Sequence, residues 1–113
     1  MIQLPCPYLQ GDVELTPERM AHIAAHHPEL PADIANSIAA ALFDPDEVRS
    51  DRRFPGTRLF SRWFDGLLKG KILVVAVVSD EPESAGGGVG RHWVVTAYPA
   101  RRITQGVIEW SRP

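Results

Sequence analysis

The segment Lys71–Ser79 constrains the fold of this chain more than any other, because its residues are almost all apolar and most are β-branched. A strand with one face in water alternates apolar and polar side chains, whereas a strand covered on both faces is a continuous apolar run. We therefore expect a strand over 71–79 near the middle of a sheet. Its apolar part, Ile72–Val78, has seven residues, far fewer than the roughly 18–20 of a membrane-spanning helix.

Two helices are predicted in the N-terminal half. Thr16 is a suitable N-cap and Pro17 a suitable first residue for a helix that continues to His27, and Pro28 ends it because the residue before a proline avoids helical geometry. A second helix is predicted from Pro31 to the Asp44-Pro45-Asp46 segment. Its apolar residues recur every four positions: Ile34, Ile38 and Leu42.

The period of the pattern then changes from helical to strand-like. The expected strands are Glu47–Asp51, Arg58–Phe64, Lys71–Ser79, His92–Tyr98 and Gly106–Trp110. Residues 1–12 are expected to form an irregular or strand-like lead-in, and 81–90 a flexible glycine-rich loop. The order predicts one α+β domain over 1–113, with two N-terminal helices packed on a four- to five-stranded, mainly antiparallel sheet.

Charge is distributed unevenly along the chain. The net charge of −2 combines −7 over residues 1–48 with +5 over residues 49–113. A basic C-terminal half is compatible with an RNA partner, since phosphates supply most of the sequence-independent affinity, and equally with arginines on the solvent face of a sheet. The lone Cys6 rules out an internal disulfide, which fits the cytoplasm, and the first residues lack the pattern of a signal peptide.

Three of the four histidines lie in the first predicted helix, between Thr16 and Glu29. Histidine titrates near neutral pH, so histidines beside an arginine are suited to proton transfer around an anion. Helical spacing places Arg19, His22 and His26 on one side. His27 falls on the apolar stripe, where a structural or helix-capping role is also compatible with its position.

Metal binding by the pair at i and i+4 is an alternative for His22 and His26. A tight site needs a third ligand, which His92, Cys6 or a carboxylate would have to supply, and the spacing requires none of them. The His-Glu-x-x-His signature is absent. We therefore expect no metal and no other cofactor.

Alternation along the predicted strand His92–Tyr98 places four of its residues on one face: His92, Val94, Thr96 and Tyr98. With Arg62 in the preceding aromatic strand, these side chains are expected to form a concave polar surface on the sheet face that the helices leave open. Thr96 and Tyr98 are also good strand formers, so a purely structural role is compatible with both.

Several motifs, taken in order, resemble a known family. They are Arg19-x-x-His22-Ile23-x-x-x-His27-Pro28-Glu29, Asp44-Pro45-Asp46-x-Val48, an aromatic strand, a valine-rich strand and Val95-Thr96-Ala97-Tyr98. They cover about residues 13–110 and resemble the phage- and mobile-element-associated branch of the BECR superfamily, the barnase–EndoU–colicin–RelE-like nucleases. The resemblance implies a compact α+β ribonuclease fold and metal-independent cleavage of RNA. Such proteins are often toxins, which implies an antitoxin or immunity protein as a partner.

Cleavage of RNA without a metal needs a base for the 2′-hydroxyl proton, an acid for the leaving 5′-oxygen and positive charge at the phosphorane. The catalytic residues that the resemblance implies are Arg19, His22, His27, Arg62, Thr96 and Tyr98. In this assignment either histidine is the base or acid, either arginine stabilises the phosphate, and the two strand residues position the substrate. Glu29 orients a histidine or caps backbone amides, and His26 lies outside the matched pattern.

A non-catalytic module that binds RNA or a protein on the same fold is the main alternative. In that case the helix histidines are structural and the basic strands contact the partner. The RNA sequence preference and the oligomeric state do not follow from the sequence.

Overall fold

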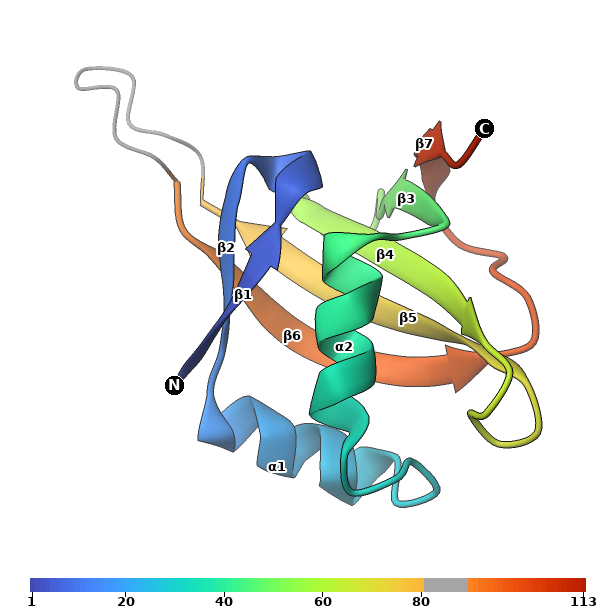
Figure 1. The fold of residues 1–113 in the computed structure, drawn as a ribbon. Helices are drawn as coiled ribbons and strands as arrows, with labels where there is room; N and C mark the ends of the chain where they lie inside the picture. The colour runs from blue at the N-terminus through green and yellow to red at the C-terminus, as the bar shows by residue number, and fades with distance from the viewer. Residues whose placement is uncertain (81–89) are drawn as a thin grey trace.

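The structure, a computed structural model, describes residues 1–80 and 90–113, in which seven strands and two α-helices follow one another (Figure 1). The elements are β1 (Ile2–Cys6), a 3-10 helix η1 (Pro7–Leu9), β2 (Gly11–Leu15), α1 (Pro17–His26), α2 (Ile34–Phe43), β3 (Glu47–Ser50), β4 (Thr57–Phe64), β5 (Lys71–Ser79), β6 (His92–Ala100) and β7 (Val107–Ser111). The α+β class with two helices is confirmed.

The strands form one mixed sheet in the order β1-β2-β6-β5-β4-β3-β7, so β5 lies at its centre as predicted. Neighbouring strands are antiparallel except β2 and β6, which run parallel through the pair Glu14–Trp93. The expected count of four to five strands is therefore wrong, and the sheet that was expected to be mainly antiparallel is a mixed one with a single parallel pair among the described residues. The expected lead-in is a β1–β2 hairpin that extends the sheet, and Pro5 is tolerated in β1 because that strand lies at the edge.

Both helices contribute to a core on one side of the sheet, and α2 crosses in front of β4 and β5 (Figure 1). Alternate residues of β5 point to that side: Leu73, Val75 and Val77. The opposite side of β3–β6, which we call the open face, carries Val74 and Ala76. They are covered by Ile103, from the connection to β7, and by Tyr98. Strand β5 is thus buried on both faces.

The helix ends follow local sequence signals. The Oγ1 of Thr16 accepts the backbone N–H of Arg19 at 3.2 Å and caps α1, and the helix ends before Pro28 as predicted. Helix α2 begins at Ile34, three residues later than predicted, since the turn from Pro31 precedes it. Among the residues that the structure describes, no helix is long and apolar enough to span a membrane.

A β-bulge at Val95 interrupts the alternation along β6. Val94 packs in the helix-side core, whereas Thr96 and Tyr98 line a hollow of the open face. The extra residue turns the second half of the strand over relative to the first half. The predicted single face that included His92 and Val94 is therefore wrong.

The connection between β5 and β6 is closed by a hydrogen bond from the backbone N–H of Asp80 to the carbonyl oxygen of Arg91, at 2.8 Å. The flexible glycine-rich loop predicted over 81–90 lies, apart from Gly90, outside the described residues.

Candidate functional site

A hollow of about 300 Å³ lies on the open face, between the 51–57 turn and the second half of β6. Its polar lining residues are Asp51, Arg53, Thr57, Thr96 and Tyr98. Apolar side chains of β4, β5 and β6 form its floor, and Phe54, which is 58% exposed, lies at its rim. A hollow with an apolar floor and a few convergent polar groups is the usual form of a ligand site.

An ion pair on one wall fixes the position of a cation. The buried carboxylate of Asp51 accepts from Nε of Arg53 at 3.2 Å, from its Nη2 at 3.1 Å and from its backbone N–H at 3.0 Å. The hydrogen bonds from Arg53 hold the pKa of Asp51 below its ordinary value, so this carboxylate stays charged and orients the guanidinium. Nη2 also donates to Oε1 of Gln105 at 2.6 Å.

Tyr98 presents a neutral phenol to the same hollow. Burial raises the pKa of Tyr98, the positive charge of Arg53 acts in the opposite direction, and the negative charge of Asp51 adds to the rise. The hydroxyl therefore keeps its proton at neutral pH and can donate it to an anion held by Arg53.

The ring of His27 lies beside that of Tyr98, a residue of β6. The chain leaves α1 at His27, whose N–H donates to the carbonyl oxygen of Ile23 at 2.8 Å. Its Nδ1 lies 3.2 Å from Oε1 of Glu29, and its ring centroid is 6.2 Å from that of Tyr98. Glu29 thus orients the imidazole of His27 through Nδ1. The other ring nitrogen, Nε2, has no hydrogen-bond partner among the described residues.

His27 does not itself line this hollow, and neither do the other predicted residues Arg19 and His22. Arg19 lines a separate hollow of about 200 Å³ with Trp93 and Arg91. The ring of His22 stacks on that of His26 at 4.1 Å. Desolvation lowers the pKa of His22, and the neighbouring positive charges of His26 and Arg19 lower it further. Of the helix histidines, His27 is the one that contacts Tyr98.

The geometry gives little support to a metal at the histidine pair. Nδ1 of His26 lies 2.9 Å from the carbonyl oxygen of His22, so its ring is tied to its own helix. Within residues 1–80 and 90–113, no group of three or more histidine, cysteine or acidic side chains is placed to hold an ion.

Arg62 lies apart from Thr96 and Tyr98. In the β4–β5 register it stands opposite Leu73, a residue of the helix-side core. Its Nη1 donates to the carbonyl oxygen of Asp44 at 3.1 Å and lies 3.4 Å from Oδ2 of that residue. The structure therefore brings His27, Thr96 and Tyr98 to one region and leaves Arg62 at the end of α2.

Sequence reasoning did not identify Asp51, Arg53 or Phe54 as site residues. They belong to the Asp51-Arg52-Arg53-Phe54 stretch, which reads as a polar connector after a short strand. The available signal was the Asp-x-Arg spacing within a turn, but only the fold shows that this turn bends over the open face.

No protein-family model, curated protein or solved structure matches this chain. The function must therefore be argued from the geometry of the site itself.

Proposed function

We propose that this protein is a metal-independent endoribonuclease that binds and cleaves single-stranded RNA on the open face. The observation that carries the proposal is that an oriented cation and a neutral phenol line one hollow, and that an oriented imidazole lies beside the phenol. They are Arg53 held by Asp51, Tyr98, and His27 held by Glu29. These are the positive charge, the acid and the base that the reaction needs.

In this mechanism the free Nε2 of His27 takes the proton of a ribose 2′-hydroxyl. The 2′-oxygen attacks the adjacent phosphorus, and the bond from phosphorus to the 5′-oxygen breaks, which leaves a 2′,3′-cyclic phosphate. Arg53 stabilises the charge of the phosphorane, and Tyr98 gives its proton to the leaving 5′-oxygen. Proton exchange with water then restores both side chains.

The hollow also has features that suit a nucleobase. Phe54 is exposed at its rim, and the guanidinium carbon of Arg53 lies 5.4 Å from the centroid of that ring. Single-stranded RNA is recognised largely by stacking of unpaired bases on aromatic side chains and arginine planes. Thr57 and Thr96 supply hydroxyls for hydrogen bonds to the sugar or the base.

The test is cleavage of a fluorescent single-stranded oligoribonucleotide in EDTA by the wild type and by H27A and H26A. We expect H27A to lose about 10²–10⁴-fold in rate, the usual effect of removing a general acid or base. His26 is the matched control, because it is the exposed histidine next to His27 in sequence, at the last position of α1, and its ring is tied to the backbone of His22. Equal rates for the two variants, or no cleavage by the wild type, would contradict the proposal.

A cellular role as a toxin-like or mobile-element-associated nuclease is part of the proposal, with an antitoxin or immunity protein as the neutralising partner. The resemblance in sequence supports this role. Expression of the wild type, but not of H27A, should then arrest growth. Binding of RNA without cleavage would instead support the non-catalytic module, and the cytoplasmic location stays a prediction.

A further inference from the structure

The catalytic hollow is the first of three neighbouring hollows that follow one another across the open face, which together we call the groove. Tyr98 also lines a smaller neighbouring hollow, and Arg102 and Ile103 join that one to a third hollow of about 410 Å³. Val78 of β5 lies in the first hollow and Ile72 in the third. Val78 lies six positions after Ile72 along β5, so at about 3.3 Å per residue the three hollows span about 20 Å.

An exposed tryptophan is held in place at the far end of this groove. Trp63 lines the third hollow and is 48% exposed. Its Nε1 donates to Oδ1 of Asp65 at 2.6 Å, and its backbone N–H donates to Oδ2 of Asp46 at 2.8 Å. The ring lies against Gly70, which has a φ of +99°, and a Cβ there would lie 2.8 Å from Cζ2 of Trp63. These contacts fix an aromatic surface that is still open to solvent.

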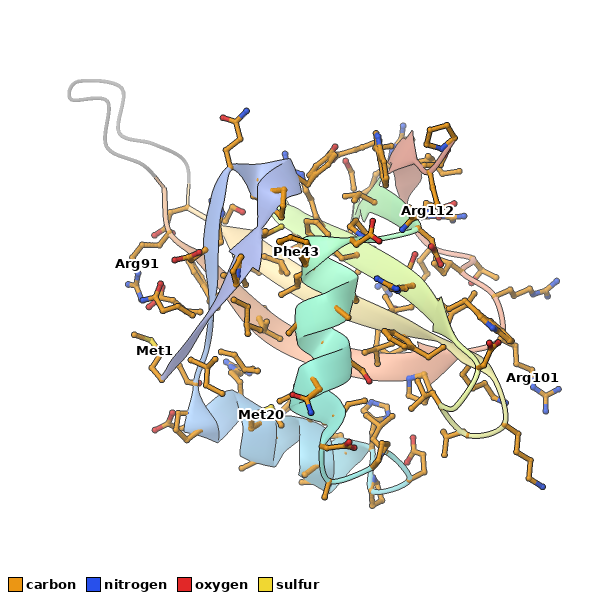
Figure 2. The ribbon with its side chains drawn as sticks, viewed as in Figure 1. Met1, Met20, Phe43, Arg91, Arg101 and Arg112 are labelled. Atoms are coloured by element: carbon orange, nitrogen blue, oxygen red, sulfur yellow. The ribbon has the colours of Figure 1, made fainter. Side chains whose placement is uncertain are left out.

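Two arginines lie beside this tryptophan without ion-pair partners among the described residues. Arg101 and Arg102 are exposed and line the third hollow, and Arg101 projects from the end of β6 (Figure 2). The other two arginines of that hollow are already paired, Arg49 with Glu47 and Arg62 with Asp44. The far end of the groove therefore has two positive charges available for an anionic ligand.

We infer that Trp63, Arg101 and Arg102 form a second, non-catalytic subsite that binds a nucleotide of single-stranded RNA flanking the cleaved bond. A base stacks on the indole ring, and the guanidinium groups contact the adjoining phosphates. The inference rests on the proposed function for the choice of RNA as the ligand. It is supported independently by the unpaired charge, by the fixed aromatic ring and by the position of this hollow on the same face as the catalytic hollow.

The test uses a fluorescent 2′-O-methyl oligonucleotide of about ten nucleotides, because the 2′-blocked chain binds but cannot be cleaved by attack of the 2′-oxygen. We expect W63A to raise its Kd about five-fold or more, the usual effect of losing one stacked base, and W63F to raise it less. The association constant K falls as salt rises, and in R101A/R102A the plot of log K against log salt should be shallower by about 1.4, since each lost phosphate contact removes about 0.7 from the slope.

The matched control is Q10E/N36E, which changes the net charge by the same amount at two exposed positions. Gln10 follows η1 and Asn36 lies on α2, so both are away from the open face. We expect this control to keep most of the affinity and the wild-type salt slope. A Kd and a slope that are the same in W63A, R101A/R102A and the wild type would overturn the inference.

Cleavage of a dinucleotide separates this inference from the proposed function. A dinucleotide occupies the catalytic hollow alone, so W63A and R101A/R102A should cleave it as fast as the wild type. Absence of cleavage together with the expected binding losses would refute the nuclease and leave the subsite standing. Normal cleavage of the dinucleotide without those binding losses would refute the second subsite and leave the proposed nuclease activity standing.

Discussion

Replacement of Asp51 by asparagine should release Arg53 and weaken both the fold and the RNA site. Asp51 is buried, with a side chain 4% exposed, whereas the side chain of Arg53 is 55% exposed. The asparagine keeps one oxygen to accept a hydrogen bond but loses the charge that holds the guanidinium. Cleavage of RNA should become slower as well, because the guanidinium of Arg53 is then no longer fixed beside Tyr98.

The size of the effect follows from this partial burial. Loss of one partner of a fully buried ion pair costs about 3–5 kcal/mol, whereas an exposed pair contributes about 0.2–1 kcal/mol. With one partner buried and the other half-exposed, we expect a coupling of about 1–2 kcal/mol between the two side chains. A urea m-value of about 1–3 kcal/mol/M makes this a readily measured shift in the unfolding midpoint.

The assay is a double-mutant cycle of urea unfolding with D51N, R53M and the double variant. The pKa of Asp51 is lowered in the folded state, so its contribution is complete above the ordinary value near 3.9 and is lost as the pH falls through the folded-state value. The coupling should therefore be present at pH 7 and disappear in strong acid. A coupling near zero at pH 7, or one that does not change with pH, would refute the reasoning.

Three further predictions concern other parts of the molecule. G106A should lower the Tm by about 4 °C or more, because Gly106 has a φ of +81° and an added Cβ would lie 2.6 Å from a backbone oxygen of β3. F60A should cost about 3–5 kcal/mol in urea unfolding because Phe60 is fully buried, whereas F54A, at an exposed ring, should cost less than about 0.5 kcal/mol but weaken RNA binding. In an NMR titration the pKa of His22 should lie below its ordinary value and rise in R19A, which removes a neighbouring positive charge.

The parts of the fold that local patterns determine were predictable from the sequence. The continuous apolar run of β5 requires cover on both faces, and the cap at Thr16 and the stop at Pro28 mark the ends of α1. Residues 1–12 were expected to be irregular or strand-like, but the place of the β1–β2 hairpin in the sheet was not predicted, because it depends on a parallel pair between β2 and β6, which are far apart in sequence. The bulge at Val95 was missed because one extra residue leaves no mark in an alternating pattern.

Part of the candidate site was also predictable, because some of its residues belong to local sequence motifs. The matched motifs include His27, Thr96 and Tyr98, and the structure brings these three to one region. The oriented cation was not predicted, because its position depends on how the 51–57 turn folds over the open face. Arg62 was expected at the site from its place in a strand, but in the β4–β5 register it lies opposite a residue of the helix-side core.

The most direct test of RNA cleavage on the open face uses a DNA oligonucleotide that contains a single ribonucleotide, incubated in EDTA with the wild type and with Y98F. We expect the wild type to cut only on the 3′ side of the ribonucleotide and to leave a 2′,3′-cyclic phosphate there, detected by mass spectrometry. Y98F, which lacks the donated proton, should cut about 10²–10⁴-fold more slowly. No cut at the ribonucleotide, a cut in the DNA linkages, or equal rates for the two proteins would contradict the proposed function.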